Sequence, residues 1–218
     1  MCVKAIASYK EKTGLSTPLV TCITDISMHP EWKADQTDLY LAPTREIKEH
    51  LICEGTKAEN ILVTGIPVRQ QFLNMDRKYL ENEKEVRRVL VMGGGLGLMP
   101  DLRRLLGKLH SMQSVQTIVI TGKNHKMYEE WVNRYEDVKV LGYTENISKY
   151  MRWADLVITK AGGITLFEIL HSQVPLFVIH PFLEQEMNNA RYAAEKGFAK
   201  VVWGKHEDYS SGTGKTSE

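Results

Sequence analysis

The chain has 218 residues, 43% of them hydrophobic and 25% charged, which is the balance of a soluble globular protein and excludes a disordered or fibrous chain. Lys and Arg (28) nearly balance Asp and Glu (27), so the net charge of +1 gives no support to bulk attraction to nucleic acid. The three cysteines are widely spaced and match neither a disulfide framework nor a zinc motif, which favours a reducing cytoplasm.

Strand-like and helix-like segments alternate over the first seventy residues. The pattern predicts a helix over Val3–Lys12. A second helix is predicted between Thr44, a good N-cap, and Gly55, a good C-terminal stop. Short β-rich runs predict three strands, at Leu19–Thr24, Leu39–Leu41 and Ile61–Thr64.

Residues 74–88 are rich in charge and poor in aliphatic side chains, so they predict a linker or a solvated helix. Residues 89–203 then alternate between aliphatic runs and helical stretches near 100–110, 125–135, 146–152, 165–172 and 184–196. This alternation predicts an α/β fold with a six-stranded parallel sheet covered on both faces, a complete Rossmann-like domain. The runs are Val89–Met92, Thr117–Thr121, Val138–Leu141, Leu156–Thr159, Leu176–Ile179 and Ala199–Val202.

The domain boundaries follow from these composition changes. Residues 1–73, with their three predicted strands, are expected to form a first unit, separated by the linker 74–88 from the domain of residues 89–203. The polar residues 204–218 lack the apolar side chains of a core and predict a disordered tail.

A glycine-rich turn, Gly93-Gly94-Gly95-Leu96-Gly97, follows the first aliphatic run of the second region. Such a turn exposes backbone N–H groups and a helix N-terminus to a phosphate, although a tight turn can require glycine without any ligand. At the end of the next run, Thr121-Gly122-Lys123 offers no acidic residue for the ribose of a dinucleotide. The pattern therefore leaves phosphate binding and a simple turn open and argues against an NAD-dependent enzyme.

Three further clusters combine polar residues with strand ends. Gly162 and Gly163 allow close approach of a ligand, and Glu168 can accept both hydroxyls of a ribose or simply interact with the helix dipole. Glu184–Asn189 can read a sugar through hydrogen bonds or form the solvated start of a helix. Asp25 and His29 are candidate general bases or surface residues of a loop.

These motifs, in this order, resemble family 28 glycosyltransferases, in particular the branch of monogalactosyldiacylglycerol synthases and processive diacylglycerol glucosyltransferases. The most specific segments are Ile23-Thr-Asp25, His29-Pro-Glu-Trp32, Val63-Thr-Gly-Ile-Pro-Val68, Val91-Met-Gly-Gly-Gly95, Thr159-Lys-Ala-Gly-Gly163 with Glu168, and Gln185-Glu186 with Asn189. The resemblance implies the GT-B fold, in which an N-terminal domain binds the acceptor and a C-terminal domain binds the UDP-sugar.

The resemblance also implies how the nucleotide is held. Gly94 and Gly95 would lie at the pyrophosphate, and the backbone around Tyr143 and Thr144 would pair with uracil. Glu168 would bind the ribose hydroxyls.

The remaining candidates would surround the diphosphate, the sugar and the acceptor. Gly162, Gly163 and Thr165 would form the helix N-terminus under the diphosphate. Asp25 and His29 would lie on the acceptor side, where either could take the proton of the attacking hydroxyl. The residues expected at the sugar or diphosphate are Gln185 and Asn189, with Glu184 and Glu186 nearby.

The implied reaction is an inverting, single-displacement transfer of a hexose from a UDP-sugar to a lipid such as diacylglycerol. It would need no metal and no further cofactor, because helix dipoles and amides can stabilise the diphosphate and no Asp-x-Asp motif occurs. A bilayer-resident acceptor implies peripheral contact with the cytoplasmic face of the membrane, with no nucleic-acid partner.

The resemblance implies that residues 1–73 are only the C-terminal part of a Rossmann-like acceptor domain, since the family's upstream glycine loop is not found before residue 18. Two readings follow. The chain is a transferase or a fragment of one, or it is a non-catalytic nucleotide-sugar-binding subunit completed by a partner chain. In either case a second copy or a partner is expected to cover the incomplete domain.

Overall fold

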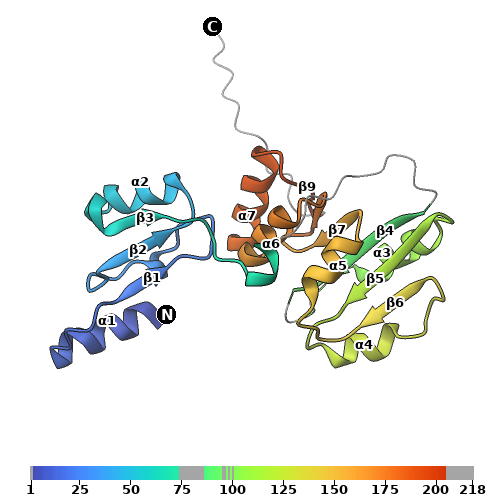
Figure 1. The fold of residues 1–218 in the computed structure, drawn as a ribbon, viewed down its shortest axis with the longest axis horizontal. Coiled ribbons are helices and arrows are strands. Elements are labelled where there is room, and N and C mark those ends of the chain that lie inside the picture. The colour runs from blue at the N-terminus through green and yellow to red at the C-terminus, as the bar shows by residue number, and fades with distance from the viewer. Residues whose placement is uncertain (1, 74–85, 95–96, 98, 100, 205–218) are drawn as a thin grey trace, which may run out of the picture.

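The computed structural model describes residues 2–73, 86–94, 97, 99 and 101–204 (Figure 1). Two parallel sheets form two units that lie side by side, a small unit of residues 2–65 and a large unit of residues 86–204, joined by a connecting segment that begins at Ile66. The predicted linker residues 74–85 and the predicted tail residues 205–218 lie outside the described residues.

The small unit contains a three-stranded sheet in the order β1-β2-β3, with strands parallel throughout. Its core is a single cluster in which buried Tyr40 and Ile61 of the sheet meet Leu51 of helix α2. Thr44 caps that helix as predicted, its hydroxyl accepting a hydrogen bond from the Ile47 N–H. The elements are α1 (Cys2–Thr13), β1 (Val20–Cys22), β2 (Leu39–Ala42), α2 (Arg45–Cys53) and β3 (Ile61–Val63).

The large unit contains the predicted six-stranded parallel sheet, in the order β6-β5-β4-β7-β8-β9. Its first strand starts two residues earlier than predicted, so the assignment of Arg87 and Arg88 to the linker is wrong. Both residues pair with β5. Only the four residues that follow them are buried, so charged side chains can occupy the start of this strand. The strands are β4 (Arg87–Met92), β5 (Val115–Ile120), β6 (Val138–Leu141), β7 (Leu156–Thr159), β8 (Leu176–Ile179) and β9 (Lys200–Val202).

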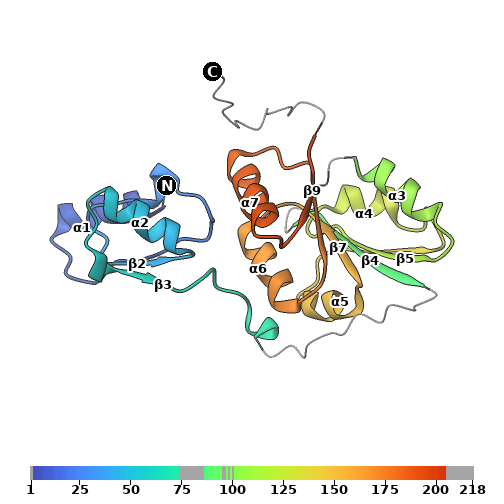
Figure 2. The same ribbon diagram turned by 90° about the horizontal axis from the view of Figure 1, so that it is seen from above.

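Helices cover both faces of the large sheet (Figure 2), because buried side chains alternate along its central strand. Leu90 and Met92 pack toward α5, α6 and α7, whereas Val89 and Val91 pack toward α3 and α4. The helix predicted near 125–135 ends earlier, at Trp131, because Asn133 adopts a positive φ of 62° that a helix cannot contain. The helices are α3 (Leu102–His110), α4 (His125–Trp131), α5 (Ile147–Trp153), α6 (Gly163–Ser172) and α7 (Glu184–Glu195).

The two units share one hydrophobic cluster. Ile26 from the small unit and Ile66 and Phe72 from the connecting segment are buried in the core that α5, α6 and α7 form with the large sheet. Phe72 ends a short 3-10 helix, Gln70–Phe72, and is 1% exposed. This packing fixes the connecting segment beside the carboxyl edge of the large sheet, where the candidate site lies.

Candidate nucleotide site

A pocket lies at the carboxyl edge of the large sheet, where the strand order reverses between β4 and β7. This switch point is where open α/β sheets bind ligands, because the loops after the two strands turn to opposite faces. The pocket brings together five of the residues expected to bind a nucleotide. They are Gly94, Tyr143, Thr144, Thr165 and Glu168, and the other lining residues are Arg69, Met92, Ile120, Ile147 and Met151.

Glu168 is held by a residue that the sequence analysis missed. Arg69 donates two hydrogen bonds to the Glu168 carboxylate, from Nε to Oε1 at 2.7 Å and from Nη2 to Oε2 at 2.8 Å. The Glu168 side chain is 3% exposed, and the hydrogen bond to this carboxylate raises the pKa of Arg69. Each oxygen keeps a second lone pair, so the carboxylate can still accept a hydroxyl of a ligand.

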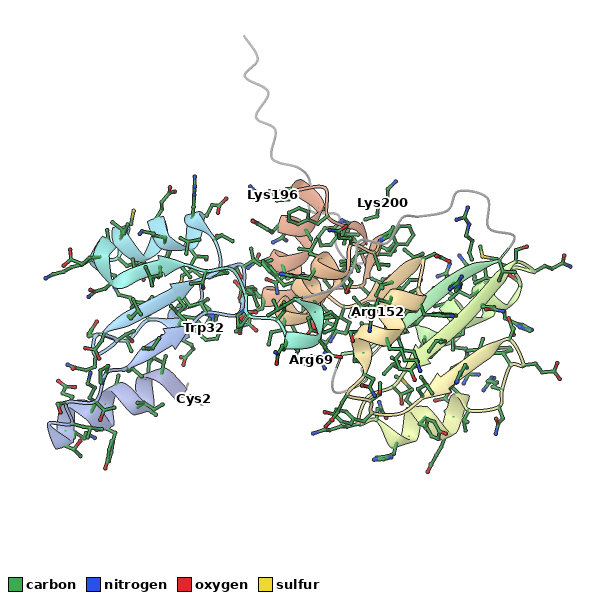
Figure 3. The ribbon with its side chains drawn as sticks, viewed as in Figure 1. Cys2, Trp32, Arg69, Arg152, Lys196 and Lys200 are labelled. Atoms are coloured by element: carbon green, nitrogen blue, oxygen red, sulfur yellow. The ribbon has the colours of Figure 1, made fainter. Side chains whose placement is uncertain are left out.

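Arg69 comes from the connecting segment and lies between the two units (Figure 3). It stands one residue beyond the Val63–Val68 motif and 99 positions before Glu168, so no local spacing pairs the two residues. In the sequence, this pairing could have been suspected only because Arg69 lies next to the Val63–Val68 segment. The planar guanidinium group of arginine suits a bidentate pair with a carboxylate.

The two glycines at the start of α6, Gly162 and Gly163, differ in their surroundings. A Cβ atom on Gly163 would meet the Thr24 carbonyl oxygen of the small unit at 2.1 Å, so only glycine permits this approach of the two units. A Cβ atom on Gly162 would meet nothing closer than the Thr165 hydroxyl, at 3.9 Å. Gly163 therefore has a packing role between the units, and its predicted contact with a diphosphate stays a prediction.

The glycine-rich turn after β4 is partly described. Gly94 has a positive φ of 71° and lines the pocket. Gly97 also has a positive φ, and a Cβ atom there would lie 1.8 Å from the Thr121 carbonyl oxygen. Gly97 is thus required by a tight turn, whereas Gly95, expected at the pyrophosphate, lies outside the described residues.

The first turns of α7 hold the residues expected at the sugar. Glu184 and Gln185 are exposed, and neither is among the residues that line the pocket. The Glu186 carboxylate pairs with the Lys160 ammonium, with 2.7 Å between Oε1 and Nζ. Asn189 is buried and hydrogen-bonded to both units, so its side chain contacts protein in this structure. The predicted roles of all four residues toward a sugar stay predictions.

The two candidate bases lie in the loop after β1. His29 Nδ1 accepts a hydrogen bond from the Glu31 N–H at 3.2 Å and caps the short helix Pro30–Trp32. Burial raises the pKa of Asp25, an effect partly opposed by hydrogen bonds from the Asn189 and Trp32 side chains and by the charge of His29. The charge of His29 thus acts on the Asp25 carboxyl group. Neither residue is among those that line the nucleotide pocket.

None of the helices in the described residues is both long and apolar enough to cross a bilayer. The same residues hold no group of three or more His, Cys, Asp and Glu side chains that could bind a metal ion. Whether the reaction is metal-independent stays a prediction.

Two family matches cover almost the whole described chain. Residues 88–209 match the glycosyltransferase family 28 C-terminal domain, and residues 1–68 match monogalactosyldiacylglycerol (MGDG) synthase. The first match spans the large unit with the pocket, and the second spans the small unit. The chain therefore belongs to glycosyltransferase family 28.

Curated relatives resemble the chain over most of its length. It is 34% identical over 207 residues to the processive diacylglycerol beta-glucosyltransferases of Bacillus cytotoxicus and of Bacillus cereus. Each alignment covers 91% of this chain and 53% of the relative. The chain thus spans about half the length of the curated relatives it matches.

Solved structures share the fold at low identity. MurG of Acinetobacter baumannii has a TM-score of 0.60 at 15% identity, covering 90% of this chain and 56% of that one. A putative UDP-N-acetylglucosamine 2-epimerase from Listeria monocytogenes has a TM-score of 0.63 at 16% identity, covering 91% and 58%. These likenesses confirm the predicted GT-B type of fold. Because a protein described as a putative epimerase has the same fold, the fold alone does not define the reaction.

Proposed function

We propose that the large unit binds a UDP-sugar and that the chain is a hexosyltransferase, or part of one, that glycosylates a lipid such as diacylglycerol. The observation that carries the proposal is the pocket at the strand-order switch point, which gathers Gly94, Tyr143, Thr144, Thr165 and Glu168. Membership of family 28 and the likeness to processive diacylglycerol glucosyltransferases support the same donor and acceptor.

The donor side of the mechanism follows from the pocket. The buried Glu168 carboxylate, oriented by Arg69, accepts the ribose hydroxyls, and the backbone at Tyr143 and Thr144 pairs with uracil. The N–H groups at the start of α6 face the diphosphate, whose negative charge grows as the glycosidic bond breaks. A helix N-terminus stabilises that charge by its dipole and its free N–H groups, so no metal is required.

The acceptor side relies on the loop that carries Asp25 and His29. The acceptor hydroxyl attacks the anomeric carbon, one of these groups takes its proton, and UDP leaves with the bonding electrons, which inverts the configuration. The raised pKa of Asp25 makes this carboxylate a stronger base than an ordinary one. The lipid acceptor brings the protein to the cytoplasmic membrane surface by peripheral contact.

A second candidate function is a nucleotide-sugar-binding subunit completed by a partner chain. It is favoured by the exposed apolar side chains of the small unit, among them Val20, Leu62 and Val63, at strands where a fuller sheet would continue. Transfer of radiolabelled hexose from a UDP-sugar to diacylglycerol separates the two. Turnover of about 1 per second or more by the purified chain supports the enzyme, and UDP binding without turnover supports the subunit.

Isothermal calorimetry with UDP tests the donor site. Glu168→Ala is expected to weaken UDP binding by about 1–3 kcal/mol, because charge-assisted hydrogen bonds to the ribose are lost. Glu195→Ala, at an exposed position of α7, is the matched control and keeps the wild-type affinity. Circular dichroism verifies that each variant is folded. An unchanged affinity in folded Glu168→Ala protein contradicts the assigned role.

A further inference from the structure

We propose that Asn189 is a positioning residue and does not bind the sugar. Its side chain joins the loop of the candidate bases to the nucleotide-binding unit by hydrogen bonds, a contact that we call the clasp. Asn189 lies on α7 of the large unit and is 1% exposed. The loop, residues 24–26, follows β1 of the small unit and carries Asp25. The role of Asp25 as a base rests on the proposed function, whereas the clasp itself does not.

Two hydrogen bonds hold the side-chain amide of Asn189, one to each unit. Oδ1 accepts the N–H of Ile26 at 3.1 Å. Nδ2 donates to the carbonyl oxygen of Ala161, just before α6, at 2.9 Å. Burial raises the pKa of Asp25, and hydrogen bonding with the Asn189 side chain partly opposes that rise. Both polar atoms of the amide are thus already engaged with backbone groups of the protein.

Independent packing holds the same loop. The Thr24 carbonyl oxygen lies so close to α6 that a Cβ atom on Gly163 would approach it to 2.1 Å. The Ile26 side chain is buried in the hydrophobic cluster of the large unit. Residues before and after Asp25 are therefore fixed by the two helices that begin at the carboxyl edge of the large sheet.

The arrangement joins the donor and acceptor sides through one amide. Asn189 is hydrogen-bonded to the turn before α6 on one side and to Ile26, the residue after Asp25, on the other. A base must be held within a fraction of an ångström of its productive position, and a buried amide hydrogen-bonded to both units supplies such rigidity. Asp25 thus takes its position from the unit that binds the nucleotide.

Amide hydrogen exchange of the ligand-free chain, read by NMR, tests the clasp directly. Asn189→Ala removes the acceptor of the Ile26 N–H, and we expect this amide to exchange at least about tenfold faster. Asn188→Ala is the matched control, because its Oδ1 accepts only a surface hydrogen bond from Arg191 on the same helix. The control is expected to keep the Ile26 rate, and the Val119 amide of β5 reports that each variant is folded.

Asn189→Asp separates the donor function from the acceptor function. It keeps an oxygen for the Ile26 N–H but places a second carboxylate near Asp25, in place of the amide that opposes the rise of the Asp25 pKa. The 13C chemical shift of the Asp25 carboxyl group, followed against pH, should then titrate at higher pH than in the wild type, with His29 and Trp32 as its remaining neighbours. An unchanged titration would overturn the contact with Asp25.

Calorimetry with UDP and with UDP-glucose distinguishes the clasp from sugar binding. Asn189→Ala is expected to preserve the ratio of the two affinities. A loss of UDP-glucose affinity alone, with the Ile26 exchange rate unchanged, would overturn the proposal and make Asn189 a sugar ligand. If the wild-type chain binds neither compound, the proposed function fails, and the exchange rate of Ile26 still decides whether the clasp exists.

Discussion

The two units differ in how fully each buries its apolar surface. In the large unit, helices cover both faces of the six-stranded sheet, and buried side chains form two clusters. The small unit has three strands and one cluster of six buried residues. Val20 and Leu62 of its sheet are each 51% exposed. The large unit therefore has the core of an independent domain, whereas the small unit depends on its contact with the large one or on a further partner.

Core truncation in each unit should give the largest effect and test this difference directly. Leu51 of α2 and Leu90 of β4 are both completely buried. Replacing either with Ala removes about 3 kcal/mol or more of stability through lost burial and the cavity that remains. We expect Leu51→Ala to unfold the small unit while the β5 amides stay protected from hydrogen exchange, and Leu90→Ala to destabilise the large unit.

One result would contradict the view that the large unit is stable by itself and the small unit is not. If Leu51→Ala and Leu90→Ala lower the protection of β2 and β5 amides equally, the two units unfold together. The shared cluster around Ile26, Ile66 and Phe72 would then be strong enough to make them one cooperative structure.

Sequence patterns predicted the large unit better than the joint between the units. Aliphatic runs of four or five residues indicate buried parallel strands by themselves, and all six were confirmed to within two residues at each end. The pairing of Arg69 with Glu168 and the closeness of Gly163 to Thr24 join residues far apart in the chain. Such contacts depend on how the finished units dock, which no local period encodes.

The same reason explains the differing outcomes of the candidate site residues. Gly94 follows β4, and Glu168 lies on α6, the helix that follows β7. The resemblance implied that both bind one nucleotide, and the pocket contains both because parallel strands end at one edge of the sheet. The resemblance implied that Asn189 faces the sugar or diphosphate, which stays a prediction. One of its two hydrogen-bond partners, Ile26, belongs to the small unit, whose docking the sequence does not reveal.

A substitution on the exposed strands of the small unit should have an effect of intermediate size, on self-association. The exposed apolar strands of the small unit are expected to associate with a second copy, so light scattering should show a mass that rises with concentration. Leu62→Lys places a charge on β3 and should weaken association about tenfold or more, the scale of burying one large aliphatic side chain. Met112→Lys is the matched control, because Met112 is equally exposed on the large unit. Equal effects of both substitutions on the association would show that the exposed strands of the small unit do not form the interface.

The smallest expected effect concerns the pH dependence of the small unit. Burial raises the pKa of Asp25, so the folded state binds this proton more tightly than the unfolded chain does. The free energy of unfolding should therefore fall as pH rises from the ordinary pKa of an aspartate through the raised one. Asp25→Asn cannot ionise, so its stability should lack this decline.

Denaturant unfolding of the small unit at a series of pH values measures this effect. Asn at position 25 also changes the hydrogen bonds with Asn189 and Trp32, but that difference is constant with pH, so only the slope decides. The wild type should lose stability relative to Asp25→Asn as the pH rises from acid toward neutral. Asp35→Asn, at an exposed position of the same unit, should follow the wild type. Parallel curves for wild type and Asp25→Asn would mean that Asp25 is solvated, and that the small unit is docked more loosely than its contacts with α6 and α7 indicate.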